Sequence, residues 1–177
     1  MTPAVGAGAR GASRPVPGDR APDFDLESHL GEEVRLPVLL VDGPVLLVFY
    51  PFAFSPVCGN EIAALVRDHG RFAEAGVRVV GISTDTKYSL AAWARELEVP
   101  FPLLSDFWPH GAVASAYGVF DAARGMAGRG AFLVNREGIV VDAVVAGPAQ
   151  ARDFRRFLPP DGTATETFSA RPSSERP

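Results

Sequence analysis

Between residues 45 and 72, an apolar run, a turn with the chain's single cysteine and a segment of helical periodicity follow one another. The run from Val45 to Tyr50 has no polar alternation, which predicts a strand covered on both faces. After Cys58, apolar residues recur at helical spacing as far as Phe72, which predicts an amphipathic helix that ends near Gly76. A strand, a turn and a helix that begins at the cysteine therefore form the centre of the predicted fold.

Shorter elements are predicted on both sides of this stretch. Alternating or apolar segments predict strands at residues 21–26, 31–36, 77–82, 101–104, 130–134 and 139–145. Helical spacing predicts helices at residues 90–97, with Ser89 as a cap, and at 111–117 and 149–158. Because strands and helices alternate before a final hairpin and helix, we predict an α/β fold with a mixed central β-sheet flanked by helices.

The composition is typical of one globular domain with polar ends. The chain has 177 residues, of which 47% are apolar and 21% charged, which is enough for a sizeable core. We predict one domain over residues 17–158, a disordered N-terminal extension at 1–16 and a disordered C-terminal tail at 159–177. The net charge of −4 gives no reason to expect a nucleic-acid or membrane partner. With no secretory signal pattern and no apolar run of about 20 residues, we expect a cytoplasmic protein.

Several other patterns are excluded by their context. Residues 6–11 fit the dinucleotide pattern G-x-G-x-x-G, but no strand is predicted before them and no helix after them, so we expect no cofactor. The three histidines (His29, His69 and His110) have no ligand spacing with other metal-binding residues, so we expect no metal. A single cysteine allows no intrachain disulfide and no Cys-x-x-Cys motif, which excludes a disulfide reductase.

The candidate nucleophile is Cys58, at the start of the predicted helix. The unpaired amides and partial positive charge of a helix N-terminus favour the reactive thiolate. Ionisation alone raises reactivity only about tenfold, so a fast enzyme also needs donors aimed at the charge that develops in the transition state. The Ser55 hydroxyl, the amides of Val57 and Cys58, and an arginine from elsewhere in the chain are the candidate donors.

The residues around Cys58 resemble the signature of the peroxiredoxins. Pro51, Ser55 and Cys58 fit the pattern Pro-x-x-x-Thr/Ser-x-x-Cys. Glu61, three positions after the cysteine, also matches that family. Arg129 precedes an apolar strand, at the place where the family keeps its catalytic arginine. The sequence is similar, in particular, to the AhpE-type one-cysteine branch.

The resemblance extends over residues 17–158. Residues 17–24 resemble the opening strand of the family, and residues 102–120 closely resemble the AhpE-type branch. Two departures are visible. Ser55 replaces the commoner threonine, which loosens the placement of the hydroxyl because serine lacks the β-methyl group. Ala131 replaces a threonine that is frequent in the family.

The resemblance implies a thioredoxin-like fold and a thiol-specific peroxidase. Cys58 would attack the peroxide and become a sulfenic acid, while Pro51 shields the thiolate. Ser55 would hydrogen-bond to sulfur and peroxide, Arg129 would orient and polarise both, and Glu61 would hold the arginine in place. Hydrogen peroxide and organic hydroperoxides are the implied substrates, with peroxynitrite as a further candidate. The implied role is antioxidant defence and redox homeostasis.

The resemblance also implies partners. Because the chain has no second cysteine, an external thiol must reduce the sulfenic acid. In the AhpE-type branch this reductant is a mycoredoxin with mycothiol, or a thioredoxin, and the sequence leaves both open. Family members pair through the surface near the active site, so we expect a homodimer. Four aromatic residues are predicted to form an apolar pocket rim suited to organic hydroperoxides: Phe52, Phe54, Phe107 and Trp108.

Three alternatives stay open at this level. Arg124 lies in the same loop as Arg129 and competes with it for the role of catalytic arginine. Glu61 has a simpler explanation as a favourable acid in the first turn of a helix. In place of a peroxidase, the chain could be a redox-sensing or binding module that uses the sulfenate as a signal, or a structural thioredoxin-like domain without redox chemistry.

Overall fold

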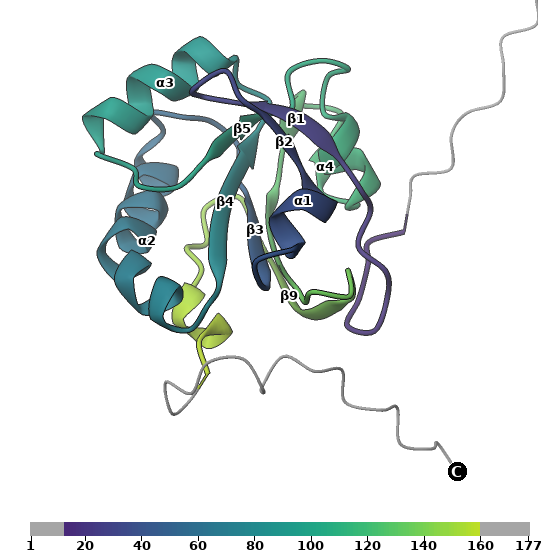
Figure 1. Ribbon diagram of the computed structural model, residues 1–177. Coiled ribbons are helices and arrows are strands. Elements are labelled where there is room, and N and C mark those ends of the chain that lie inside the picture. The colour runs from purple at the N-terminus through teal and green to yellow at the C-terminus, as the bar shows by residue number, and fades with distance from the viewer. Residues whose placement is uncertain (1–12, 160–177) are drawn as a thin grey trace, which may run out of the picture.

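A seven-stranded mixed sheet runs through the computed structural model, which describes residues 13–159 (Figure 1). The strand order is β2-β1-β5-β4-β3-β8-β9. The strands are β1 (Asp25–Ser28), β2 (Glu33–Arg35), β3 (Val45–Phe49), β4 (Arg78–Ser83), β5 (Leu103–Ser105), β8 (Arg129–Val134) and β9 (Val140–Ala146). Strands β3, β4 and β5 are parallel, whereas β8 is antiparallel to both β3 and β9. The predicted α/β fold with a mixed sheet is confirmed.

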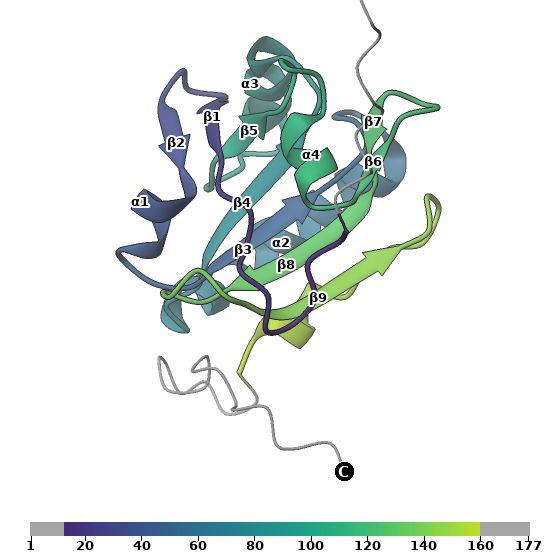
Figure 2. The same ribbon diagram turned by 90° about the vertical axis from the view of Figure 1, so that its right-hand side faces the viewer.

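Helices cover both faces of this sheet (Figures 1 and 2). Helices α2 (Pro56–Glu74) and α3 (Lys87–Glu96) lie on one face, and α1 (Leu36–Leu40) and α4 (Ala112–Ala116) lie on the other. The small hairpin of β6 (Phe120–Asp121) and β7 (Met126–Ala127) and the 3-10 turn η1 (Phe154–Phe157) complete the described elements. None of the helices in residues 13–159 has the length and apolar character needed to cross a membrane.

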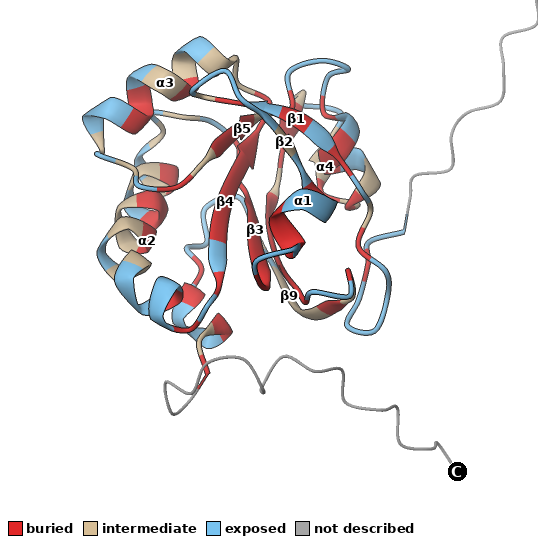
Figure 3. Ribbon diagram, in the orientation of Figure 1, coloured by how far each residue is buried: buried red, intermediate tan, exposed pale blue. Residues whose placement is uncertain are grey.

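Strand β3 contributes side chains to two hydrophobic cores, one on each face of the sheet. Successive side chains of a strand point to opposite faces. Val45, Leu47 and Phe49 accordingly join the core that contains α1 and α4, and Leu46 and Val48 join the core under α2 and α3. All five are completely buried, and red covers β3 and the inner sides of the helices in Figure 3. The prediction of a strand covered on both faces is confirmed.

Some predicted boundaries were wrong. Helix α3 begins at Lys87, and its cap is Thr86, whose hydroxyl accepts a hydrogen bond from the Ser89 amide at 3.4 Å. Residues 149–158 form only the 3-10 turn η1, because the main-chain N–H of Arg152 bonds to a carboxylate in α2 instead of continuing a helix. Helix α1 and the β6–β7 hairpin were not predicted, since elements of five and two residues are too short to show a period.

The N-terminal boundary of the domain lies earlier than predicted. Pro15 is buried, although residues 13–16 were predicted to be disordered. Arg14 packs against Gly118, where an added Cβ would lie 2.8 Å from the Arg14 Cα, so only glycine permits this approach. The rest of the predicted N-terminal extension and the predicted tail from residue 160 lie outside the described residues.

Candidate active site

The topology brings three separate segments to one edge of the sheet. Strand β3 ends at Phe49 and leads through residues 51–55 into α2. Because β8 is antiparallel to β3, its first residue, Arg129, lies at the same edge as the carboxyl end of β3. Strand β9 returns to this edge, where Ala146 is the partner of Arg129. The Cys58 loop, Arg129 and the chain after β9 therefore converge.

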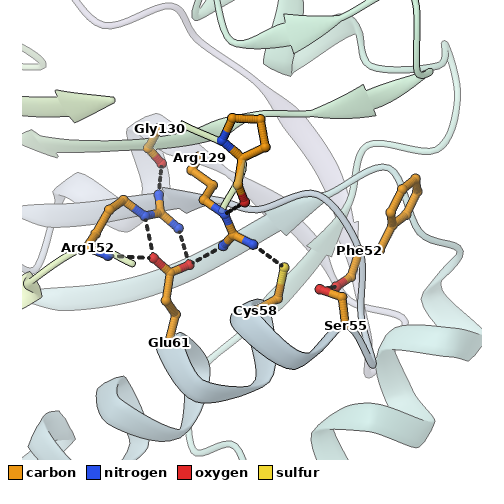
Figure 4. Close-up of polar contacts among 8 residues, drawn as sticks. Phe52, Ser55, Cys58, Glu61, Arg129, Gly130 and Arg152 are labelled. Atoms are coloured by element: carbon orange, nitrogen blue, oxygen red, sulfur yellow. Dashed lines mark hydrogen bonds and ion pairs between the residues drawn. The ribbon is translucent and has the colours of Figure 1, made fainter. Parts of the chain in front are cut away.

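Cys58 and Arg129 meet in the interior at this edge (Figure 4). Cys58 is the third residue of α2 and is completely buried, and Arg129 is only 3% exposed. The Arg129 Nη2 donates a hydrogen bond to the Cys58 sulfur at 3.4 Å, and its Nε donates to the Pro148 carbonyl at 2.7 Å. A guanidinium presents its N–H donors in a fixed fork, so Arg129 directs a charge-assisted hydrogen-bond donor at the sulfur.

The competing arginine lies elsewhere. The side chain of Arg124 is 63% exposed and forms an ion pair with Asp121 at 2.8 Å, within its own loop. The structure therefore brings Arg129, and not Arg124, to the cysteine.

A buried carboxylate holds Arg129 from the opposite side. The Glu61 Oε2 accepts from Arg129 Nη1 at 2.6 Å and from Arg152 Nη2 at 2.9 Å. Its Oε1 accepts from the main-chain N–H of Arg152 at 2.9 Å and from the Arg152 Nε at 3.0 Å. Arg152 Nη1 also donates to the Gly130 carbonyl at 2.7 Å. Both carboxylate oxygens are thus fully used, which fits a structural holder of arginine better than a simple first-turn acid.

Sequence reasoning missed Arg152. It lies in the stretch that was predicted as a helix, close to Arg155 and Arg156, and nothing in the spacing separates the three arginines. In the structure the side chain of Arg152 is 1% exposed, whereas those of Arg155 and Arg156 are 62% and 46% exposed. Only the fold shows which of them faces the site.

The remaining residues of the predicted motif lie near Cys58, but within the described residues none of them forms a hydrogen bond to the sulfur as Arg129 does. Pro51 is buried at the start of the loop. Ser55 precedes α2, but its hydroxyl donates to the Phe52 carbonyl at 3.1 Å and not to the sulfur (Figure 4). Val57 is half-buried in the first turn of α2. The hydrogen bond predicted from Ser55 to the sulfur is therefore not formed in this arrangement of the described residues.

A pocket of about 450 Å³ opens beside Arg129 and Pro51. Its apolar wall comes from the β6–β7 region and β9: Val119, Phe120, Met126 and Val145. The four aromatics predicted to form the rim do not line this pocket. Phe52, Phe54, Phe107 and Trp108 are 42%, 54%, 48% and 80% exposed on the surface. The wall was missed because its residues come from segments with no strong periodic pattern.

Tyr50, the residue before the loop, stays neutral. Its ring packs on Trp93 with centroids 5.4 Å apart, and among the described residues its buried hydroxyl has no hydrogen-bond partner of normal geometry. Burial raises the pKa of Tyr50 far above its ordinary value, and the nearby Ser83 side chain offsets this only in part. Tyr50 therefore adds no charge near Cys58.

Comparisons with known proteins identify the family. The AhpC/TSA family pattern matches residues 17–143. The chain is 42% identical over 139 residues to alkyl hydroperoxide reductase E of Mycobacterium tuberculosis, covering 78% of this chain and 90% of that protein. The chain belongs to the AhpC/TSA family of peroxiredoxins.

Solved peroxiredoxin structures have the same architecture. Peroxidoxin BcpB from Mycobacterium tuberculosis superimposes with a TM-score of 0.71 at 36% identity, over 75% of this chain and 86% of that one. The reduced 2-Cys peroxiredoxin of Plasmodium vivax gives a TM-score of 0.73 at 30% identity, over 80% and 78% of the two chains. The thioredoxin-like fold implied by the sequence resemblance is confirmed. The single cysteine of this peroxiredoxin is consistent with a one-cysteine mechanism.

Proposed function

We propose that this peroxiredoxin reduces hydrogen peroxide and organic hydroperoxides through Cys58, and that an external thiol completes each cycle. The contact between Arg129 and the Cys58 sulfur is the observation that carries the proposal. It pairs the chain's single thiol with a buried, permanently charged donor. Membership of the peroxiredoxins supports peroxide as the substrate class.

The proposed reaction is an attack of sulfur on oxygen. The Cys58 thiolate attacks the terminal oxygen of the peroxide, an S–O bond forms and the O–O bond breaks. The leaving oxygen takes a proton and departs as water or alcohol, and Cys58 becomes a sulfenic acid. An external thiol then attacks this sulfur, releases water and leaves a mixed disulfide, which a second thiol reduces.

The surrounding residues are proposed to act on the developing charge. Arg129 orients the peroxide and stabilises charge on its oxygens, since preorganised donors act strongly where water is excluded. Glu61 and Arg152 keep Arg129 in place. Pro51, buried beside the pocket, shields the thiolate from water, and the Ser55 hydroxyl turns from the Phe52 carbonyl to the peroxide when substrate enters.

The finer assignments are also proposals. A mycoredoxin with mycothiol, or a thioredoxin, is the proposed reductant, and the similarity to alkyl hydroperoxide reductase E supports a reductant of that branch. A homodimer, peroxynitrite as a further substrate and a cytoplasmic location stay predictions. The absence of a metal and of a cofactor stays an expectation.

A peroxide-consumption assay on purified, reduced protein tests the function. Wild-type protein is expected to consume about one equivalent of peroxide and to stop until a thiol is added, with one oxygen gained at Cys58 by mass spectrometry. Cys58→Ser is expected to consume none. Unchanged consumption of peroxide by Cys58→Ser would contradict the proposal. A stable sulfenate that no cellular thiol reduces would instead favour the redox-sensing module.

A further inference from the structure

We propose that Asp85 is a positioning residue that holds the Cys58 loop in its reactive arrangement, a role that rests on the proposed peroxidase function. Asp85 lies in the connection between β4 and α3. Its Oδ2 accepts a hydrogen bond from the main-chain N–H of Ala53 at 2.8 Å. Ala53 is the middle residue of the loop, two positions after Pro51 and two before Ser55.

The loop needs an external anchor. Among the residues that the structure describes, Ala53 contributes the only N–H of positions 51–54 that bonds to a different segment. The next residue, Phe54, has a φ of +63°, a left-handed conformation that a bulky residue keeps only when its surroundings hold it. The Phe54 ring is itself 54% exposed, with Trp93 of α3 as its aromatic neighbour at 6.1 Å. The bond from Ala53 to Asp85 is therefore a main restraint on the loop.

The Asp85 carboxylate is itself fixed to the sheet. The Ser83 hydroxyl donates to the same Oδ2 at 2.7 Å, and the Asp85 N–H donates back to Ser83 Oγ at 3.3 Å. The Ser105 hydroxyl donates to the Asp85 carbonyl at 2.7 Å. Ser83 ends β4, which is paired in parallel with β3, and Ser105 ends β5, which is paired in parallel with β4. Asp85 thus anchors the loop to the ends of β4 and β5 through hydrogen bonds.

A displacement of Ala53 would also move the loop residues before and after it, which lie next to the reacting groups. Pro51 lines the pocket beside Arg129, and Ser55 is the residue from which α2 and its Cys58 begin. A displacement of about 1 Å at a reacting centre lowers a rate by as much as about 10²-fold. Asp85 forms no hydrogen bond with Cys58 or Arg129 within the described part of the chain, so it acts through the loop.

Three variants and two measurements test this role. Asp85→Ala removes the acceptor, whereas Asp85→Asn keeps one oxygen that can accept from both Ala53 and Ser83. Asp68→Ala, which removes a carboxylate from α2 that pairs with Arg155 away from the loop, is the matched control. The measurements are the rate of Cys58 sulfenate formation with hydrogen peroxide and the hydrogen exchange of the Ala53 amide, both on the full-length protein.

Asp85→Ala is expected to slow sulfenate formation by about 10- to 100-fold and to speed exchange at Ala53. Asp85→Asn is expected to restore both values to within a few-fold of wild type, and Asp68→Ala to change neither. A wild-type rate in Asp85→Ala, unchanged exchange at Ala53, or no rescue by Asp85→Asn would overturn the proposal. If wild-type protein forms no sulfenate, the peroxidase function itself fails, and exchange at Ala53 still decides whether Asp85 anchors the loop.

Discussion

The guanidinium of Arg129 reaches the sulfur of Cys58 at 3.4 Å although the two residues are 71 positions apart. The sheet register produces this contact. Val48, near the end of β3, pairs with Ala131 of the antiparallel β8, which places Arg129 beyond the end of β3, where the Cys58 loop begins. The contact between Arg129 and Cys58 therefore depends on the pairing of two buried strands, and not only on contacts between loops.

Replacing Arg129 should be the most damaging change at the site short of removing the thiol. Arg129→Ala removes the buried guanidinium that donates to the Cys58 sulfur, and loss of such a donor typically costs about 10²–10³ in rate. Arg129→Lys keeps the charge but loses the fork that reaches Cys58 and Glu61 together, so we expect only partial recovery. Stopped-flow measurement of sulfenate formation at several peroxide concentrations checks both values.

Arg124→Ala is the matched control for Arg129. Because its side chain is exposed and pairs with Asp121 in its own loop, we expect a rate within about twofold of wild type, as is usual for surface positions. Equal losses in Arg124→Ala and Arg129→Ala would contradict the assignment of the catalytic arginine.

Much of this arrangement was visible in the sequence, because its signals are local. The apolar run of β3, the helical period of α2 and the spacing of Pro51, Ser55 and Cys58 lie within one continuous stretch. Glu61 was assigned from the resemblance to the family, at the position three residues after Cys58. These patterns can be recognised in the sequence because β3 buries both faces as a continuous apolar run and α2 buries one periodic face.

The parts that escaped prediction depend on contacts between distant segments. Arg152 looks like its neighbours in the sequence, and only the return of the chain after β9 brings it to Glu61. Asp85 follows an ordinary buried strand, and its bond to Ala53 depends on the adjacency of β3 and β4. The surface aromatics, of which Trp108 is the most exposed, were assigned to the pocket because aromatic character does not reveal direction.

The pair of Glu61 and Arg152 should matter first for stability. Arg152→Ala removes two of the four hydrogen bonds of the buried Glu61 carboxylate, those from the Arg152 Nε and Nη2. The bonds from Arg129 and from the main-chain N–H of residue 152 remain. Breaking a buried charge pair typically costs about 3–5 kcal/mol, so we expect a loss of about 3 kcal/mol in urea-induced unfolding because Arg129 still pairs with Glu61.

Two further variants make this measurement decisive. Arg156→Ala breaks the exposed pair with Asp142 and should cost less than about 1 kcal/mol. Glu61→Gln combined with Arg152→Ala should cost less than the sum of the single changes, since both act on one network. Additive losses would contradict the coupling between the two residues.

The ion pair of Asp68 and Arg155 should make part of the stability depend on pH. Arg155 Nε donates to Asp68 Oδ2 at 2.8 Å and joins η1 to α2. This hydrogen bond is the main reason why the pKa of Asp68 lies below its ordinary value of 3.8, with smaller contributions from the charges of Arg155 and Arg71. Because the folded protein binds the proton more weakly than the unfolded chain, protonation favours unfolding.

The contribution is therefore complete above the unfolded pKa near 3.8 and is lost as the pH falls through the lower folded value. At neutral pH we expect Asp68→Ala to lower the free energy of unfolding by about 0.5–1 kcal/mol, as for an ion pair whose arginine is exposed to solvent. Urea unfolding across the acid range should show this gap closing as the pH falls. Arg155→Ala should reproduce the same profile, because it removes the other half of the pair. A gap that stays constant with pH would mean that packing of the side chain, and not its charge, stabilises the contact between η1 and α2.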